Sequence, residues 1–343
     1  MLIDEPIRAI LARYRVSPHT AAIESLGMAG GLSGALFWRI RLPNRKLILR
    51  RWPAEHPTAE RLAFIHAVLR HVSDRGIKLI PVPLLTNDKQ SFVETDGRFW
   101  ELAPWMPGTA SFATAPNTEK LSAAMRTLAQ FHLAVADFDS TLHTTISPKP
   151  KAPGPEPISP PIMRRAMQLT RALADGSAVF HRATGDSDWP ELVPLAREFV
   201  AALPSAAPKV MALLEPVSQA NLPLQVCLRD IWHDHIIFTG DELTGLVDFG
   251  ALDIDTPAGD IARLLGSLVG DDHESWKSGI EAYESVRLLS PDEHAALPGL
   301  DAASTIIALS NWLRWLYLEH RQFENREQVM ARFAALLERI RNH

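Results

Sequence analysis

The residues with the clearest chemistry lie between positions 228 and 250. Asp230 is followed five residues later by His235, and Asp248 comes thirteen residues after His235. Phosphoryl transfer needs a carboxylate that orients or receives the proton of an acceptor hydroxyl. It also needs a hard anionic ligand for the Mg²⁺ that bridges nucleotide phosphates. Asp230 and Asp248 can serve these two tasks if the strands that carry them end at one cleft.

The residues around these two carboxylates follow a known pattern. Arg229-Asp230-Ile231, with Asp248-Phe249-Gly250 after it, resembles the catalytic loop and the D-F-G motif of the protein-kinase-like superfamily. The apolar flanks and the run DTPAGDIARLL over 255–265 are more similar to the aminoglycoside phosphotransferase and choline kinase branch. The resemblance is strongest over about 225–268 and continues, more weakly, over about 25–110.

That resemblance assigns roles to individual residues. It implies that Asp230 is the catalytic base, that Asp248 is the principal metal ligand, and that Asp260 is a buried residue bracing the loop. It implies an ATP-dependent phosphotransferase that moves the γ-phosphate to a hydroxyl of a small molecule, such as an aminoglycoside, an amino alcohol or a sugar. ATP with Mg²⁺ is the expected cofactor, with GTP and Mn²⁺ as alternatives.

The same resemblance implies an α+β fold of the protein-kinase-like type, built from two lobes. Residues 1–104 would form a small β-rich N-lobe that binds the nucleotide phosphates, and 105–110 a hinge. Residues 111–343 would form a larger, mostly helical C-lobe that holds the catalytic loop and the acceptor site. Within it, the proline-dense stretch 144–161 predicts an exposed, extended insertion, because proline disrupts regular elements.

Two positions of the catalytic loop depart from the family pattern, which reads roughly H-x-D-x-x-x-x-N. Leu228 stands in place of the histidine, which has mainly a structural role there, and His235 stands in place of the asparagine that helps to hold the metal. Imidazole nitrogen favours softer ions than an amide oxygen does. His235 could therefore bind Mn²⁺, contact phosphate as a cation, or be a polar loop residue that leaves Asp248 as the main ligand. An alternative function follows from these changes: a catalytically impaired kinase-fold protein that binds nucleotide or a protein partner without turnover.

A basic residue ends a predicted strand where the superfamily has a phosphate-binding lysine. Here the run Leu-Ile-Leu leads to Arg50, which keeps the charge and can grip phosphate with two donors. Lys46 lies on the same strand face and is the second candidate, whereas Arg51 should point the other way. Glu60, at the start of the next predicted helix, is either the ion-pair partner of Arg50 or a surface residue favoured there by the helix dipole.

A glycine-rich segment precedes these strands. Gly30, Gly31 and Ser33 lie in a link between two predicted strands, where backbone N–H groups and a hydroxyl could approach phosphates closely. The segment lacks the G-x-x-x-x-G-K-[ST] pattern, and no helix follows it. These two features exclude a P-loop NTPase. Further along, 101–106, with Glu101 and Ala103, would line the adenine slot with backbone donors and acceptors before the hinge.

The elements that must position these residues follow from apolar spacing and turn signals. Strand patterns around Pro43-Asn44 predict an antiparallel meander, and Asp96-Gly97 predicts a hairpin. Helical spacing predicts helices over 58–75, 117–136, 162–175 and 190–202, and in most of the chain after 257. The stretch 224–253 reads as strand, loop, strand, turn and strand.

Composition limits the class of protein. The chain has 343 residues, 46% apolar residues and a net charge of −5, which argues for two lobes and against a nucleic-acid partner. A single cysteine, Cys227, excludes an internal disulfide and reads as a buried small residue. The N-terminus does not read as a signal peptide and no apolar run is long enough to span a membrane, so we expect a cytoplasmic protein with no membrane partner. The oligomeric state stays open.

Overall fold

The computed structural model describes residues 4–17, 20–28, 34–139, 158–183, 189–321, 323 and 326–342. Its contacts divide the chain into two compact units. The first unit consists of Met1–Pro148 and His233–Leu252, and the second of Lys149–Trp232 and Asp253–His343. The boundaries predicted at 104 and 110 divide the chain by function rather than by contacts, and they stay a prediction.

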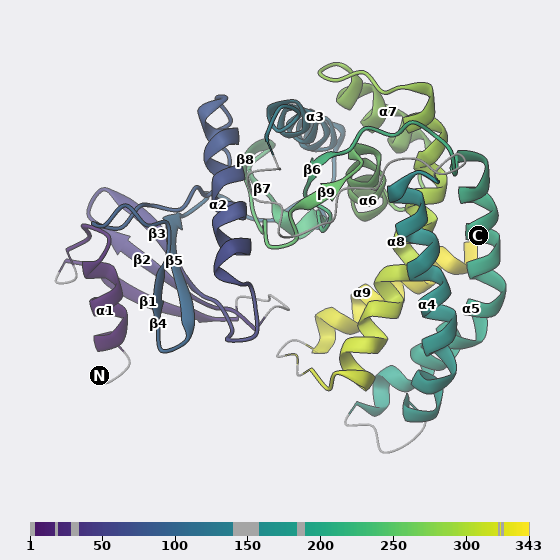
Figure 1. Cartoon of the computed structure of the whole chain (residues 1–343), viewed down its shortest axis with the longest axis horizontal. Helices are drawn as coiled ribbons and strands as arrows, with labels where there is room; N and C mark the ends of the chain where they lie inside the picture. Colours follow the sequence, from purple (N-terminus) through teal and green to yellow (C-terminus); the bar gives the residue numbers. More distant parts are fainter. Residues whose placement is uncertain are drawn as a thin grey trace. The chain divides into compact units, whose positions relative to one another are not determined.

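The first unit is built on an antiparallel sheet of five strands in the order β1-β2-β3-β5-β4 (Figure 1). The strands are β1 (Ala22–Gly27), β2 (Leu36–Leu42), β3 (Arg45–Arg51), β4 (Val93–Thr95) and β5 (Arg98–Pro104). A tight turn at 43–44 joins β2 to β3, and a turn at 96–97 joins β4 to β5. The predicted meander and hairpin are therefore confirmed.

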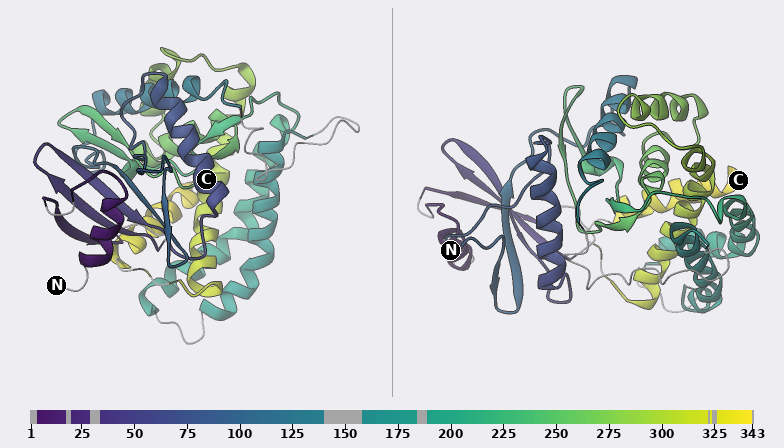
Figure 2. Two further views of the ribbon diagram at one scale, coloured as in Figure 1. Left: turned by 60° about the vertical axis from the view of Figure 1, so that its left-hand side comes forward. Right: turned by 45° about the horizontal axis from the view of Figure 1, so that its top comes forward.

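Alternation along these strands gives the sheet two different faces. On one face, Trp38, Leu49 and Leu102 are buried against helix α1 (Asp4–Ala12). The other face carries the residues between them, including Arg50, and helix α2 (Ala59–Asp74) lies on that side of the sheet (Figures 1 and 2). Alternate residues of a strand point to opposite faces of a sheet. The apolar residues of these strands therefore pack in the core, and Arg50, the candidate phosphate-binding residue, lies on the opposite face.

The rest of the first unit carries the segment around Asp248. It comprises helix α3 (Thr118–Ala134), the short turn η4 (His233–His235) and the hairpin of β7 (Ile236–Thr239) and β8 (Glu242–Leu246). The backbones of Thr109 and Phe238 donate to each other, at 2.9 and 2.8 Å. The Thr244 hydroxyl donates to the carbonyl oxygen of Pro107 at 2.6 Å. The segment after β5 is therefore fixed to this hairpin.

The second unit is mostly helical, as expected for the C-lobe. A short strand pair, β6 (Gln225–Cys227) and β9 (Asp253–Asp255), flanks the catalytic-loop segment. The helices are α4 (Pro160–Ala183), η2 (Pro190–Leu192), α5 (Val193–Leu214), η3 (Glu215–Val217), α6 (Pro257–Val269), α7 (His273–Glu284), α8 (Pro291–Leu313), η5 (Arg314–Leu318) and α9 (Arg326–Asn342). Helices α4, α5 and α8 pack on one another.

Two expectations about the helices need correction. The proline-dense insertion was predicted to have no regular structure up to 161, but Pro160 and Pro161 begin α4. Proline suits the first turn of a helix, where its missing N–H has no intrahelical partner to lose. The helix predicted over 190–202 extends through α5 although Pro204 and Pro208 lie inside it. Residues 144–157 of the predicted insertion lie outside the described residues.

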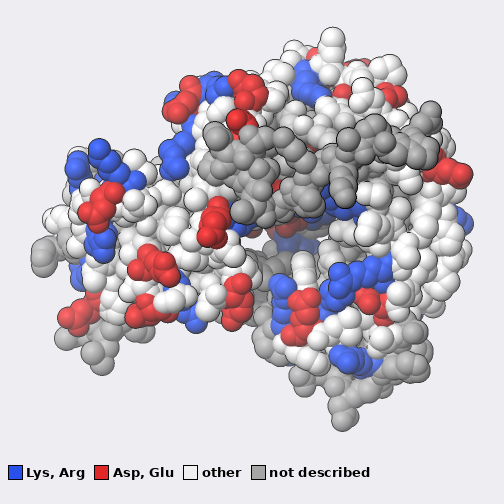
Figure 3. All heavy atoms as spheres, viewed as in Figure 1, with Lys and Arg blue, Asp and Glu red and all other residues white. Residues whose placement is uncertain are grey.

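One stretch, Pro190–Val217, meets the length and composition of a membrane span. A single stretch of this kind is weak evidence for a membrane protein, because core helices of soluble proteins meet the same test. On the face shown in Figure 3, the described basic and acidic side chains are interspersed. This distribution agrees with the net charge of −5 and gives no support to a nucleic-acid partner.

The fixed segment after β5 yields a first prediction. Gly108 has φ +103°, and a Cβ atom added to it would overlap the carbonyl oxygen of Phe238. Gly76 has a similar φ of +97° but open space around it. We expect Gly108→Ala to lower the free energy of unfolding by clearly more than Gly76→Ala, which should cost only the backbone strain of about 1–2 kcal/mol.

Urea denaturation of both variants measures this difference. Equal losses of stability would mean that the contact between the 107–109 segment and β7 does not constrain the backbone at Gly108.

Candidate active site

Arg50 lies in a row with two other residues across the face of the sheet that α2 covers. The strand register places Phe37 and Arg50 opposite each other, and Arg50 opposite Glu101. The guanidinium of Arg50 stacks on the Trp52 ring, 3.4 Å from its centroid, and its Nη1 lies 3.9 Å from Glu101 Oε1. The Arg50 side chain is only 12% exposed, so its position is largely fixed.

Glu101 is itself held by a buried histidine on α2. His66 Nε2 lies 2.7 Å from Glu101 Oε2, and its Nδ1 lies 2.8 Å from the Ser91 hydroxyl. Burial acts to raise the pKa of Glu101, but the hydrogen bond with His66 and the charges of His66 and Arg50 outweigh it. The pKa of Glu101 therefore lies below its ordinary value. His66, Glu101 and Arg50 thus form a row of polar contacts that runs from α2 through β5 to β3.

Glu60 does not take the place predicted for it. Within the described residues, the ion pair of Arg50 is with Glu101, and Glu60 is exposed at the start of α2. Hydrogen bonds with its own backbone N–H and with the Thr58 hydroxyl hold the pKa of Glu60 below its ordinary value. This environment matches the alternative reading, a surface residue at a helix N-terminus. The acid comes instead from a strand beside β3, which no local sequence motif identifies.

The remaining basic residues of the sheet lie as the alternation predicts. Arg51 stacks over Trp38 and Trp100 on the core face, at 5.9 and 5.5 Å from the ring centroids. Lys46 lies on the same face as Arg50 and lines a pocket of about 510 Å³. That pocket also contains Arg39, whose guanidinium lies 4.2 Å from the centroid of the Trp105 ring. The pocket therefore adjoins the stretch predicted to bind adenine, and its wall is cationic.

Asp248 and His235 come together in the first unit. His235 Nε2 lies 3.7 Å from Asp248 Oδ2, and the His235 side chain is 17% exposed. Asp248 has φ +63° and accepts a hydrogen bond from Gly250 N–H at 3.4 Å. Left-handed backbone at a non-glycine residue costs about 1–3 kcal/mol and is concentrated at functional sites. The strained backbone therefore lies at the residue whose carboxylate is nearest the His235 imidazole.

This pair fits a divalent cation. Ligand atoms that share an ion with bonds of about 2.1 Å lie about 3 to 3.5 Å apart, close to the observed separation. Within the described residues, Nδ1 of His235 is buried without a hydrogen-bond partner. One carboxylate and one imidazole form a donor set that suits Mn²⁺ as well as Mg²⁺.

An arginine of α2 anchors the backbone after Asp248. Arg61 Nη2 donates to the carbonyl oxygens of Leu252 and, at 3.4 Å, of Gly250. Phe249, the residue before Gly250, is buried, with its ring 6.2 Å from that of Phe131 on α3. No sequence pattern indicates this role for Arg61, because a basic residue in the first turn of a helix usually faces solvent.

Asp230 belongs to the second unit, at the exposed end of a tightly held loop. The buried carboxylate of Asp260 accepts hydrogen bonds from the backbone N–H groups of Leu228, at 2.6 Å, and Arg229, at 2.7 Å. Arg229 has φ +63° and Leu228 is buried, at 3% exposure. The predicted bracing role of Asp260 is therefore confirmed, and the burial of Leu228 agrees with a structural role for position 228. Asp230 follows with a side chain that is 55% exposed.

Arginines surround the other carboxylates near this loop. Asp255 is 2% exposed and lies within 2.8 Å of both Arg164 and Arg165. Asp253 lies 2.9 Å from Arg229, and Arg263 on α6 donates to Asp230 through its Nη2. Asp230, Asp253 and Asp255 are thus each paired with at least one guanidinium, and Asp260 with backbone N–H groups.

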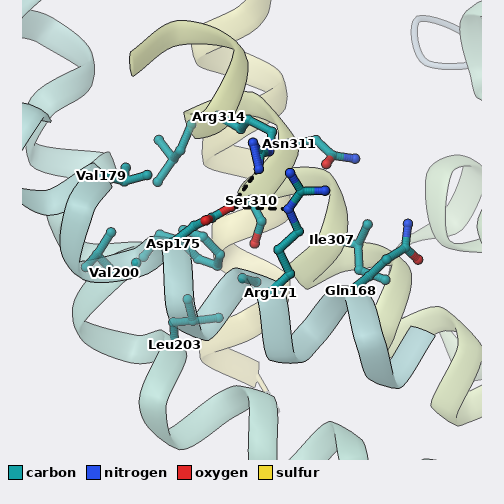
Figure 4. Close-up of a pocket in the computed structure, with 14 residues that line it drawn as sticks. Gln168, Arg171, Asp175, Val179, Val200, Leu203, Ile307, Ser310, Asn311 and Arg314 are labelled. Carbon is teal, nitrogen blue, oxygen red and sulfur yellow. Dashed lines mark hydrogen bonds and ion pairs between the residues drawn. The ribbon is translucent and has the colours of Figure 1, made fainter. Parts of the chain in front are cut away.

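Two further features of the second unit lie outside this loop. Cys227 is buried, as predicted, and burial and the nearby Asp260 raise the pKa of its thiol well above the ordinary value. A pocket of about 140 Å³ lies between α4, α5 and α8 (Figure 4). In it, Arg314 donates to Oδ2 of Asp175 at 3.0 Å, and Nε of Arg171 lies 3.7 Å from the same oxygen. Neither feature has a role in the predicted chemistry.

For the remaining predicted nucleotide-binding residues, the described part of the chain does not test the predicted role. Gly30, Gly31 and Ser33 lie outside the described residues, so their contact with phosphate stays a prediction. Glu101 and Ala103 lie in β5 in register with β3, and Ala103 is buried. Their role in binding adenine through the backbone also stays a prediction.

Comparison with known proteins identifies the family. The model of the phosphotransferase enzyme family matches residues 27–300. The chain is 28% identical to a homoserine kinase of Bradyrhizobium diazoefficiens over 261 residues, covering 74% of this chain and 69% of that protein.

Solved structures show the fold. An aminoglycoside phosphotransferase from Alicyclobacillus acidocaldarius superposes with a TM-score of 0.65 at 15% identity, over 98% of this chain and 93% of that one. A spectinomycin phosphotransferase bound to AMP gives a TM-score of 0.69 at 12% identity, over 98% and 97%.

The fold is therefore the two-lobe, protein-kinase-like α+β fold that the sequence predicts. The chain belongs to the phosphotransferase enzyme family, because the family model matches most of its length.

The lowered pKa of Glu101 gives a second prediction, on stability. A carboxyl group with a lower pKa in the folded state stabilises the protein above its unfolded pKa, about 4.3, and loses this contribution as pH falls through the folded value. We expect Glu101→Gln to lower the free energy of unfolding by about 3 kcal/mol at pH 7, because His66 and Arg50 lose their anion.

The difference between wild type and Glu101→Gln should shrink in acid below about pH 4. Urea denaturation across pH 3–7 measures it, and Glu60→Gln on the exposed start of α2 is the control, with a much smaller effect. A difference that stays constant to pH 3 would contradict an ionised, paired Glu101.

Proposed function

We propose that this protein transfers the γ-phosphate of ATP to a hydroxyl group of a small molecule. GTP is the alternative donor. The observation that carries the proposal is the pair of preserved carboxylates: Asp230 on a loop braced by Asp260, and Asp248 beside His235. The family match and the homoserine kinase relatives support it.

Arg50 would bind the phosphates of the nucleotide. A guanidinium can donate to two phosphate oxygens at once, and stacking on Trp52 leaves that of Arg50 little freedom to move. Glu101 on β5 pairs with Arg50, and His66 on α2 in turn holds Glu101 in place. The glycine segment with Gly30, Gly31 and Ser33 would cover the phosphates, and the backbone at Glu101 and Ala103 would meet the adenine.

Asp248 and His235 would hold the divalent cation. The cation, when bound, neutralises charge on the transferred phosphoryl group. The positive φ of Asp248 and the anchoring of Leu252 by Arg61 fix the carboxylate for this purpose. Mg²⁺ and Mn²⁺ both suit this donor set.

Asp230 would orient the acceptor hydroxyl and receive its proton. Most of the catalytic effect in phosphoryl transfer comes from positioning and electrostatics, so a rigid loop matters as much as basicity. Asp260 supplies this rigidity through two short hydrogen bonds to the loop backbone. The exposure of Asp230 leaves its carboxylate accessible to an acceptor.

L-Homoserine is the first acceptor to test, because the relatives at 28% identity carry that name. Aminoglycosides, amino alcohols and sugars complete the panel. We place this activity in the cytoplasm, with no nucleic-acid or membrane partner. The second candidate function, a catalytically impaired kinase-fold protein that binds nucleotide or a protein partner without turnover, rests on the changes at Leu228 and His235.

A third prediction separates these two functions. ATP with Mg²⁺ or Mn²⁺ at about a hundred times Kd should stabilise the protein by about 2.7 kcal/mol, seen as a rise in Tm. Asp230→Asn should keep this rise and lower kcat by a factor of about 10² to 10⁴, because it removes the base and not the nucleotide site. Phosphate transfer over the acceptor panel provides the kinetic readout.

Asp88→Asn, at an exposed aspartate paired with Arg13, is the control and should keep both binding and turnover. No thermal shift with any nucleotide and metal would exclude nucleotide binding in both candidate functions. Unchanged turnover in Asp230→Asn would remove this residue from the mechanism.

A fourth prediction tests the metal ligand. His235→Asn restores the amide oxygen of the family pattern, so we expect the ratio of kcat/KM with Mg²⁺ to that with Mn²⁺ to rise by about tenfold. His233→Asn, two residues away and 3.2 Å from Asp234, is the matched control and should leave the ratio unchanged. An unchanged ratio in His235→Asn would mean that His235 does not bind the metal.

A further inference from the structure

Arg263 occupies an unusual position for an arginine beside a candidate catalytic base. It lies on α6, its side chain is 23% exposed, and its Nη2 donates to Oδ1 of Asp230. Within the described part of the chain, Asp230 is its one partner, and its Nε is buried without a hydrogen bond. A guanidinium has five donors, and a largely buried one normally has most of them satisfied.

We propose that Arg263 binds a carboxylate group of the acceptor, so that this enzyme selects hydroxy acids over uncharged or purely cationic alcohols. The proposal rests on the proposed phosphotransferase function. A guanidinium can contact two carboxylates at once, one along each edge of its fork. Arg263 would keep one edge on Asp230 and present the other to the acceptor, which places the acceptor hydroxyl beside the base.

The charges around the loop support a carboxylate and oppose a polycation. Asp253 and Asp255 could have bound ammonium groups of an acceptor, but arginines already neutralise both. Asp260 is buried and occupied by two backbone N–H groups. A polycationic acceptor would meet the guanidinium of Arg263 directly beside the hydroxyl site, where like charges repel.

The span of the contact also limits the acceptor's size. Arg263 and Asp230 touch, so the carboxylate and the reacting hydroxyl must belong to neighbouring parts of one small molecule. A short-chain hydroxy amino acid meets this requirement, whereas a carboxylate at the far end of a large antibiotic does not.

The test compares two acceptors that differ only in the carboxylate. L-Homoserine and 3-aminopropan-1-ol share the hydroxyl, the chain and the ammonium group, and only homoserine carries the carboxylate. We expect kcat/KM of the wild-type protein to favour homoserine by about 10- to 100-fold, the usual effect of a charge-assisted hydrogen bond. Arg263→Leu should abolish most of this preference by raising KM for homoserine, and Arg263→Lys should keep part of it.

Arg314→Leu is the matched control. Arg314 has the same 23% exposure and a similar ion pair, to Asp175, in the same unit. This variant should lose comparable stability in a thermal melt and keep the preference for homoserine. If Arg314→Leu instead removes the preference, the carboxylate binds in the pocket between α4, α5 and α8, and the proposal is wrong.

Two further outcomes would overturn it. Equal losses of kcat for both acceptors in Arg263→Leu would show that Arg263 only positions Asp230. A wild-type protein that phosphorylates 3-aminopropan-1-ol as efficiently as homoserine would leave the phosphotransferase function intact and remove the carboxylate site. Absence of turnover with every alcohol is a different result, because it contradicts the proposed function itself.

Discussion

The candidate catalytic loop depends on one buried carboxylate. Asp260 is 2% exposed, and its two oxygens accept the backbone N–H groups of Leu228 and Arg229. A buried carboxylate without partners would cost several kcal/mol, so the loop and α6 stabilise each other. The left-handed backbone at Arg229 persists because these hydrogen bonds and the ion pair with Asp253 hold it. The position of the exposed Asp230 therefore depends on the buried contacts of the two residues before it.

In the first unit, contacts with a neighbouring element likewise hold a strained backbone, at Asp248. Its backbone is also left-handed, and a neighbouring element again holds the chain, here through Arg61 of α2 and the carbonyl oxygen of Leu252. The local strain is small compared with the contacts that fix it. Both key aspartates thus lie at or beside a strained residue on a short connection between strands. Such strain can persist only where surrounding contacts determine the backbone.

The sequence alone predicts the strands, the hairpins and the two aspartates, because these depend on local spacing and on a motif with a fixed gap. It does not predict that Glu101 pairs with Arg50. That pairing arises from the register between β3 and β5, strands that are far apart in the chain, and no local pattern encodes it. Glu60, at the start of the helix after β3, is one candidate for that partner, but it is exposed. Likewise, Arg263 looks like an ordinary helix residue until the fold brings α6 against the loop.

The arginine at position 50 suits an acidic partner that lies on the neighbouring strand. In protein kinases, the strand lysine pairs with a glutamate on the helix after it, and the ion pair depends on where that helix lies. Here the acid lies on the adjacent strand, so the Arg50–Glu101 contact forms within one sheet. An arginine suits this arrangement because its longer, planar group can stack on Trp52 while it contacts Glu101. Helix α2 then contributes two contacts: His66 hydrogen-bonds to Glu101, and Arg61 donates to the backbone carbonyl oxygens that follow Asp248.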